Sequence, residues 1–422
     1  MYKLKSITNT NNKDTFYANF NLYQYTSKYD DTFIKTRNNK LKLFYDFNTG
    51  LNAYTQETQK AEAIFYNNTI TNADLKNKFI CILNSKNKQQ TKITSLLKQK
   101  GAKGIIRILE DNKSFPGNIA LQKRLKEQLN SKKYFLNFTE CNNFISFNMS
   151  KSSAAMLFDM QLKSFNNELK RYKKNKKTKI LNKTTSFSYN LPAKTDTIEV
   201  KNIIGIIPGT DLKNEVIAIT AHYDHLGKNK KVYFPGADDN GSGISVLLET
   251  AKILSKYYQK GISPRRTIAF IAFTGEEQNL LGSKYLLEND SIIDVNKIVA
   301  NINIDMVGRG SSHHKESPNQ LYILGRNFDT NILELSDSIN NIYSYLTLDY
   351  KYTIDDPKKY FEKSDQFSFI QKDIPSVFYF GGTHKDLHTP KDTYGKINFN
   401  RLKKVTLLTF RTLWAAANND KL

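Results

Sequence analysis

The chain has 422 residues, of which 39% are hydrophobic and 12% aromatic, so it can bury a large core and is expected to form two globular domains. No apolar stretch approaches the roughly 18 residues that a membrane-spanning helix needs. The sequence therefore predicts no transmembrane segment. Its two cysteines, Cys81 and Cys141, lie far apart, which allows one disulfide at most and excludes a cysteine-rich zinc module.

The formal net charge of +23 raises the question of a nucleic-acid or other polyanionic partner. The densest basic run, "KRYKKNKKTK" at residues 170–179, follows apolar residues at helical spacing. We interpret it as a solvated helix end and linker. The remaining cations are spread along the chain and are not gathered around interleaved aromatic residues. The sequence therefore predicts no specific nucleic-acid partner.

The first half of the chain resembles a small α/β unit without a catalytic constellation. After a polar N-terminal stretch, the pattern predicts a strand at residues 75–83, an amphipathic helix at 93–104 and a second strand at 105–109. The organisation changes near residue 190.

From residue 190 onward, short apolar runs alternate with helical segments. An amphipathic helix is predicted over residues 242–258, after "DDNGSG". Runs that are apolar on both faces are typical of strands in a parallel sheet that is covered by helices on both sides. The sequence therefore predicts an α/β fold with a doubly wound, mostly parallel sheet flanked by helices. The predicted strands are "EVIAIT" (215–220), "RTIAFIAF" (266–273), "KIVANINI" (297–304) and "IPSVFYF" (374–380).

Histidines and carboxylates follow these predicted strands directly or open the next helix. Ligands of such sheets bind outside the carboxyl ends of the strands, so these side chains are expected to converge on one rim. Taken singly, "HYDH" could be a hydrogen-bonded loop, "GADDNGSG" a turn or an acidic calcium-like loop, and "GEE" a helix N-terminus. Together they favour a metal centre. The residues are His222, Asp238, Glu276, Glu277, Asp305 and His388.

Two histidines and three carboxylates are too many ligands for one ion and suit a pair of zinc ions that share a carboxylate. We predict that one ion takes His222 and Asp305, that the other takes Glu277 and His388, and that Asp238 bridges them. Glu276 then remains free to act as the general base and acid.

The other two polar residues of "HYDH" receive different roles. Asp224, two residues after His222, is expected to accept the second N–H of that imidazole and so to fix its orientation. His225 points the other way and is expected to be structural.

The ordered motifs "AHYDHLG", "GADDNGSG", "FTGEEQNLLGSKYL", "NIDMVGR" and "LHTPKDT" resemble the di-zinc aminopeptidase family that also includes glutamate carboxypeptidase, the transferrin receptor and glutaminyl cyclase. The resemblance covers residues 190–422. It implies the five metal ligands, the base Glu276 and the supporting Asp224 assigned above, and it implies a cis peptide between Asp238 and Asp239.

Residues 55–150 resemble the protease-associated domain that is inserted in many members of this family. The predicted organisation is an N-terminal part of the peptidase domain at 1–54, the insert at 55–150, a basic helix and linker at 151–189, and the di-zinc peptidase domain at 190–422. Residues 55–150 are expected to be dispensable for the ligand geometry.

Two departures from the family pattern stand out. No apolar signal segment is seen at the N-terminus, whereas an exported leader is usual, so the chain is expected to be N-terminally truncated and its complete form secreted or periplasmic. Gln366 in "KSDQFSF" stands where many relatives have histidine, which is expected to affect substrate contacts rather than the metal ligands.

The expected function is that of a zinc metallopeptidase, a hydrolase that removes N-terminal residues from peptides or proteins with a free N-terminus. The nearest alternative is a glutaminyl cyclase-like aminoacyltransferase with a single zinc. A catalytically silent receptor-like protein is disfavoured, because such relatives lose ligands that this chain keeps. A binder of anionic polymers remains a third class.

Overall fold

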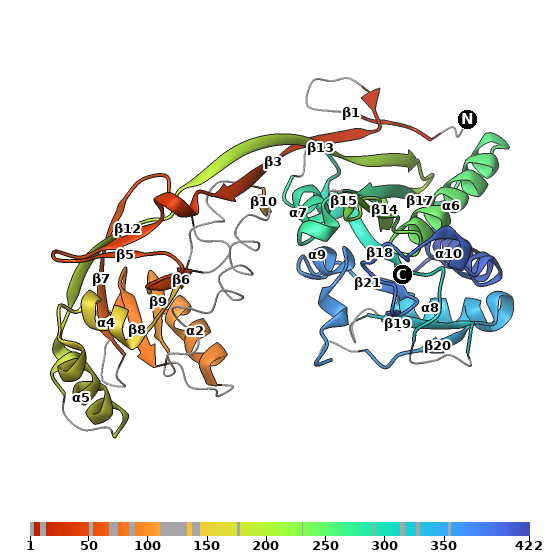
Figure 1. Ribbon diagram of the computed structural model, residues 1–422. Helices are drawn as coiled ribbons and strands as arrows, with labels where there is room; N and C mark the ends of the chain where they lie inside the picture. Colours follow the sequence, from red (N-terminus) through yellow and green to blue (C-terminus); the bar gives the residue numbers. More distant parts are fainter. Residues whose placement is uncertain are drawn as a thin grey trace. The chain divides into compact units, whose positions relative to one another are not determined.

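The computed structural model describes residues 4–8, 14–49, 54–66, 75–83, 89–109, 133–136, 144–174, 178–229, 231–289, 292–312, 317–325, 330–352 and 356–422. The chain forms two compact units (Figure 1). The first unit comprises residues 1–21 and 199–422, and the second comprises residues 22–198. The chain passes from one unit to the other within strands β3 (Tyr17–Ser27) and β13 (Ala193–Ile207).

The first unit is an α/β structure in which strands and helices alternate along the chain. Its strands are β1 (Ile7–Thr8), β2 (Asp14–Thr15), β14 (Leu212–His222), β15 (Gly227–Asn229), β16 (Val232–Phe234), β17 (Arg266–Phe273), β18 (Ile298–Asp305), β19 (Gln320–Leu324), β20 (Thr347–Asp349) and β21 (Ser376–Phe380). Its α-helices are α6 (Gly241–Gln259), α7 (Leu281–Leu287), α8 (Thr330–Ile339), α9 (Gln366–Ile370) and α10 (Phe399–Asn418). A 3₁₀ turn, η5, spans Glu276–Gln278.

The main sheet of the first unit belongs to a nine-stranded sheet of order β10-β3-β13-β17-β14-β18-β21-β19-β20, in which β10 spans Lys133–Phe135. The four central strands, β17, β14, β18 and β21, are mutually parallel. Strand β13 runs antiparallel to β17, and β19 runs antiparallel to β21. The predicted mostly parallel sheet is therefore confirmed. The predicted runs at 215–220 and 266–273 lie within β14 and β17, and those at 297–304 and 374–380 begin one and two residues before β18 and β21.

Both faces of this sheet are buried, which explains why the strand sequences are apolar throughout. Side chains of β14 alternate between two cores: Ile217, Ile219 and Ala221 pack on one face with α6, α8 and α10. Val216 and Ala218 pack on the other face with residues of α7 and α9. Helices thus cover the sheet on both sides (Figure 1), as the doubly wound prediction required.

The second unit is built on an eight-stranded sheet of order β5-β4-β12-β7-β8-β9-β11-β6. Strands β7, β8, β9 and β11 are parallel neighbours. The strands are β4 (Phe33–Lys35), β5 (Lys40–Lys42), β6 (Phe47–Thr49), β7 (Gln59–Phe65), β8 (Phe79–Leu83), β9 (Gly104–Ile108), β10 (Lys133–Phe135), β11 (Ile145–Met149) and β12 (Thr185–Asn190); the helices are α2 (Gln89–Gln99), α4 (Lys151–Leu157) and α5 (Leu162–Lys173). Strand β10 pairs with β3, not with this sheet.

The second unit extends beyond the predicted insert at 55–150 in both directions. Strand β12 pairs with β4 and with β7, so the segments on either side of the predicted insert belong to its sheet. Phe165 and Leu169 of α5 are buried in the same core. Residues 151–189, which we expected to form a basic helix and linker, contain α4 and α5 and are part of this compact unit.

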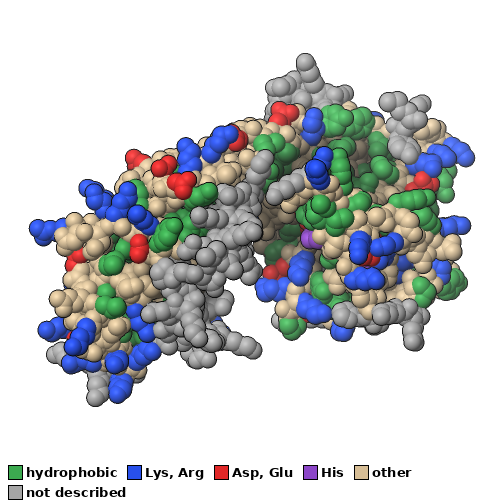
Figure 2. All heavy atoms as spheres, in the orientation of Figure 1, with side chains coloured by type: hydrophobic (Ala, Val, Ile, Leu, Met, Phe, Trp, Pro, Cys, Tyr) green, Lys and Arg blue, Asp and Glu red, His purple; other side chains and the backbone are tan. Residues whose placement is uncertain are grey.

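The remaining expectations concern the basic residues, the cysteines and membrane-spanning helices. The basic run at 170–179 begins at the end of α5, as predicted, and residues 175–177 lie outside the described part of the chain. Lys and Arg side chains are scattered over the face shown in Figure 2. Cys81 is buried and free, and Cys141 lies outside the described residues. Among the described residues, no helix combines the length and the apolar character needed to cross a bilayer.

Candidate metal centre

The carboxyl ends of the four parallel strands bring the predicted side chains to one rim. Strand β14 ends at His222 and β18 ends at Asp305, while the residues after β17 form η5 with Glu276 and Glu277. His388 lies in the loop that follows β21. The rim is therefore assembled by parallel register, as the sequence predicted.

Asp239, not Asp238, occupies the position between the two histidines. Its Oδ1 lies 3.4 Å from His222 Nε2, and its Oδ2 lies 3.0 Å from His388 Nε2. Around it, His222 Nε2 lies 3.3 Å from Asp305 Oδ1, and His388 Nε2 lies 3.3 Å from Glu277 Oε2. The two predicted pairs are brought together, with one carboxylate shared between them.

The prediction that Asp238 bridges the pairs is wrong. Asp238 is fully buried and turns away from the rim. Its Oδ1 accepts a hydrogen bond from the Gly308 backbone N–H at 2.7 Å. Its Oδ2 lies 3.0 Å from His384 Nε2. The predicted cis peptide is also misplaced by one residue, because it joins Asp239 to Asn240.

A dense hydrogen-bond network fixes the loop that presents Asp239. Asn240 caps α6, since its Oδ1 accepts from the Gly243 N–H, and its Nδ2 donates to the carbonyl of Ile304 at the end of β18. A Cβ at Gly243 would lie 2.3 Å from that Oδ1 and 2.5 Å from that carbonyl oxygen, so only glycine fits here. The first turn of α6 is thereby tied to the strand that carries Asp305.

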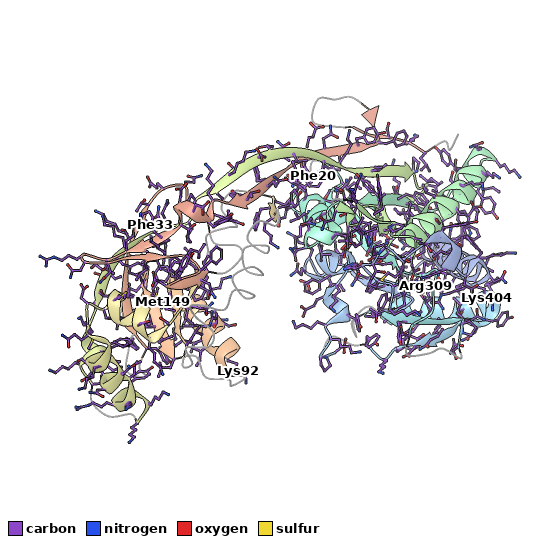
Figure 3. All side chains as sticks on the ribbon, viewed as in Figure 1. Phe20, Phe33, Lys92, Met149, Arg309 and Lys404 are labelled. Carbon is purple, nitrogen blue, oxygen red and sulfur yellow. The ribbon has the colours of Figure 1, made fainter. Side chains whose placement is uncertain are left out.

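The backbone of the two aspartates is held from a second side by Asp392. Its Oδ2 accepts hydrogen bonds from the N–H groups of Asp238 and Asp239, at 3.0 and 3.2 Å. Arg309, labelled in Figure 3, lies 3.7 Å from the other oxygen of Asp392 and 3.0 Å from Asp386. Sequence reasoning missed this support, because Asp392 stands among several polar residues of one loop and nothing local distinguishes it.

The main-chain carbonyl of Asp224, not its carboxylate, is the nearer partner of the His222 imidazole. His222 Nδ1 lies 3.0 Å from the Asp224 carbonyl oxygen, to which it can donate, and 3.8 Å from the carboxylate. The carboxylate instead accepts the backbone N–H of Glu276 at 3.2 Å. The prediction assumed that side chains alternate between two faces as far as Asp224, which would place its carboxylate beside the imidazole. The strand ends at His222, so this alternation does not reach Asp224. Asp224 still orients this imidazole and also anchors the turn that carries Glu276.

Glu276 and Glu277 point to different parts of the centre, as predicted. Glu276 Oε2 lies 3.9 Å from His222 Nε2, whereas Glu277 faces His388 and His225. Glycine at 275, with φ of +72°, allows the chain to turn out of β17 immediately before them. Both glutamates line a cleft of about 600 Å³ together with Asp239, Asp305 and His388.

The concentration of buried carboxylates shifts the pKa of several groups. Burial raises the pKa of Glu276 well above its ordinary value, and the negative charge of Asp305 adds to that rise. Burial opposes a charge on His222, yet the Asp305 and Glu276 carboxylates raise its pKa well above the ordinary value. Hydrogen bonds to Asp239 and Glu277 raise the pKa of His388 to about 10. The rim is thus strongly negative and favours cations.

Two residues singled out from the sequence have other surroundings than expected. His225 lies at the rim, with Nδ1 2.7 Å from Glu277 Oε1, so the expectation that it points away is wrong. Gln366 is fully buried, where its Nε2 donates to the Phe361 carbonyl and its Oε1 accepts from Asn303. It is not among the described residues that line the cleft.

Comparison with known proteins gives a consistent family assignment. Aminopeptidase YwaD of Bacillus subtilis (strain 168) is 30% identical over 229 residues, which are 52% of this chain and 46% of that protein. A probable leucine aminopeptidase of Trichophyton verrucosum (strain HKI 0517) is 31% identical over 203 residues, or 47% of this chain and 52% of that protein. The chain thus spans about half the length of these curated relatives.

The solved structure of an aminopeptidase from Aneurinibacillus sp. strain AM-1 aligns with 96% of this chain and 86% of its own, with 18% identity and a TM-score of 0.49. Residues 202–413, half of the chain and the part that holds every side chain of the rim, match the model of Peptidase family M28. The chain therefore belongs to Peptidase family M28.

Proposed function

We propose that this protein is a zinc-dependent aminopeptidase that holds two zinc ions and acts on peptides or proteins with a free N-terminus. The observation that carries the proposal is the position of the Asp239 carboxylate, with one oxygen facing His222 and the other facing His388. A single carboxylate between two separate sets of donors is the arrangement that a pair of metal ions requires. The names of the relatives, which are aminopeptidases, support the same activity.

The donor set fits zinc. Imidazole nitrogen and carboxylate oxygen are the ligands of catalytic zinc sites. His222, Asp239 and Asp305 would hold one ion, and Asp239, Glu277 and His388 would hold the other. Glu277 Oε1 is buried and lies 2.7 Å from His225 Nδ1, and a buried carboxylate oxygen needs a compensating donor or cation. A cation at this position would satisfy that oxygen.

When bound, zinc polarises the carbonyl of the scissile bond and lowers the pKa of water, which is the chemistry that peptide hydrolysis needs. Glu276 is placed to take the proton of the attacking water on Oε2 and to pass it to the leaving amine. Its raised pKa suits this role, because a carboxylate that accepts and returns a proton works best when its pKa approaches the working pH. The backbone hydrogen bond to Asp224 holds Glu276 in position.

The cleft beside these donors has an apolar wall. Tyr360, Phe367, Phe378 and Phe380 line it, with Met306, Leu280 and Leu387. Lys284, Glu362 and Lys363 also line the cleft. We infer that the wall receives the side chain of the substrate's N-terminal residue, and that the neighbouring carboxylates attract its ammonium group.

The apolar wall leads to a prediction about substrates. Aminoacyl substrates with N-terminal Leu or Phe are expected to have kcat/KM values at least about tenfold higher than those with N-terminal Lys, because a charged side chain loses hydration against the aromatic wall, whereas an apolar side chain gains from burial there. Steady-state kinetics on a panel of aminoacyl p-nitroanilides measures the difference. Equal values for Leu and Lys would show that this wall does not receive the side chain.

The experiment that tests the activity combines product analysis with zinc analysis. Peptides with free N-termini are expected to lose their first residue, acetylated versions are expected to stay intact, and the protein is expected to contain two zinc ions per chain. Release of ammonia and a pyroglutamyl product from an N-terminal Gln peptide, with one zinc, would identify a glutaminyl cyclase-like enzyme instead. Zinc binding without turnover of any peptide would favour the receptor-like alternative.

We also propose that the second unit is a protease-associated-like insert that is not needed for metal binding. Every side chain of the proposed centre belongs to the first unit. The chain leaves this unit within β3 and returns to it within β13. A chain in which residues 22–198 are replaced by a short Gly/Ser linker is therefore expected to keep two zinc ions. Elemental analysis checks this, with circular dichroism as the control for folding; loss of zinc from a folded chain would contradict it.

A further inference from the structure

We propose that His225 is a sixth metal-binding side chain, which supplies an imidazole nitrogen to the zinc position formed by Asp239, Glu277 and His388. The inference rests on the proposed function and assigns a role to a residue that lies outside the five predicted ligands. It makes the two zinc positions chemically unequal.

Distances place His225 in direct contact with this zinc position. Its Nδ1 lies 2.7 Å from Glu277 Oε1 and 3.7 Å from Asp239 Oδ2. The other Glu277 oxygen lies 3.3 Å from His388 Nε2. The two oxygens of one carboxylate therefore each face a different imidazole, and the ring centroids of His225 and His388 are 5.7 Å apart. Four side chains thus surround one small volume.

The imidazole of His225 is buried against the carboxylates of this zinc position. Its side chain is only 9% exposed, and Nε2, the ring nitrogen that does not face Glu277, makes no hydrogen bond within the described structure. The Glu277 oxygen that faces Nδ1 is buried as well, and it contacts the imidazole at 2.7 Å. A buried imidazole nitrogen and a buried carboxylate oxygen held this close can both bind a cation that lies beside them. Imidazole nitrogen and carboxylate oxygen together match zinc.

Backbone packing fixes the ring of His225 in this orientation. Gly236 adopts a φ of +60°, and a Cβ built on it would lie 2.6 Å from Cγ and 2.7 Å from Cδ2 of the ring. The backbone of Gly236 can approach the imidazole closely only because glycine has no side chain. A ring held against the main chain in this way loses little freedom when it binds a metal.

The proposed contact makes one zinc position richer in nitrogen than the other. The position at Asp305 has His222 as its imidazole ligand, whereas the position at Glu277 has both His388 and His225. Because imidazole favours zinc and the later divalent metals over magnesium or manganese, the Glu277 position is expected to bind zinc more tightly. Removing His225 is then expected to weaken this position selectively.

The test uses the full chain and its His225→Ala variant, with Leu226→Ala as the matched control. Leu226 is the next residue in the same loop, and its side chain is 39% exposed. Zinc affinity is measured at equilibrium against a competing chromophoric chelator. We expect two zinc ions in the wild type and in Leu226→Ala. In His225→Ala we expect one site to be unchanged and the other to be weakened at least about 10- to 100-fold.

The visible absorption of the cobalt(II)-substituted protein supplies a second readout. Loss of a nitrogen ligand is expected to change this spectrum in His225→Ala, whereas a residue that only orients Glu277 would weaken binding and leave the spectrum as in the wild type. His225→Gln keeps the side-chain volume and serves if the alanine variant does not fold. An unchanged spectrum, or two sites of wild-type affinity in a folded variant, would overturn the proposal. A wild type without zinc would instead overturn the proposed function itself.

Discussion

Replacing Glu276 by Gln is expected to lower kcat by about 10²- to 10⁴-fold while both zinc ions stay bound. The amide has the same shape as the carboxylate but cannot take a proton from water. Burial raises the pKa of this carboxyl group, which fits a group that gains and returns a proton in each cycle. Zinc content and steady-state kinetics, measured on the same sample, check the expectation.

Glu277→Gln is the matched comparison for Glu276→Gln, because Glu277 is the next residue in the chain and is assigned to the metal. A neutral amide replaces a charged oxygen ligand, so one zinc site is expected to weaken, and excess zinc is expected to restore part of the activity. The roles of the two glutamates are reversed if Glu276→Gln loses a metal, or if Glu277→Gln keeps both metals and is inactive.

The second large effect is expected at Asp239. In Asp239→Asn the negative charge that faces both zinc positions disappears, so zinc affinity is expected to fall at both. Loss of a residue that only orients a metal ligand lowers affinity roughly 10- to 100-fold, and the loss of Asp239 is expected to exceed that. Activity is expected to fall with it. Isothermal titration with zinc, on protein first stripped by a chelator, measures both sites.

Asp238→Asn separates a structural role from a metal-binding role. In Asp238→Asn the amide oxygen can still accept from Gly308, but a neutral NH2 group replaces the buried oxygen that faces His384 Nε2, so the change is expected to cost about 1–3 kcal/mol of unfolding free energy. Both zinc sites are expected to remain. Urea denaturation measures the stability of this variant, and zinc titration measures its metal sites. Unchanged stability together with loss of zinc would contradict the account.

The alternation of apolar runs was sufficient to predict the peptidase sheet. A strand that is buried on both faces leaves a continuous apolar sequence, as in β17, and a parallel sheet places the residues after each strand at one edge. That reasoning located His222, Glu277, Asp305 and His388 without any knowledge of the loops. It worked because His222 and Asp305 end strands, and Glu277 and His388 lie in the segments that follow β17 and β21 at the same edge.

The choice between Asp238 and Asp239 could not be made in the same way. Both residues lie in the short loop before α6, where no regular repeat says which side chain faces the rim. The outcome depends on partners far along the chain, chiefly Gly308 and His384, which take up the Asp238 carboxylate. His225 was misjudged for a related reason, because the strand ends at His222 and alternation does not extend beyond it.

The extent of the second unit was underestimated because its outer strands give weak signals. Strand β4 has three residues, and β12 alternates buried and exposed positions in a mostly polar sequence. Their pairing joins segments more than 150 residues apart, as the partners Phe33 and Asn190 show. Local sequence patterns carry no information about such pairing.

The most direct test of the dinuclear centre is the anomalous scattering of zinc in crystals of the zinc-loaded protein. The account predicts two peaks, about 3.5–4 Å apart, one on each side of the Asp239 carboxylate. His222 and Asp305 should contact the first peak, and Glu277 and His388 the second. A single peak, or peaks that flank Asp238 instead, would contradict it.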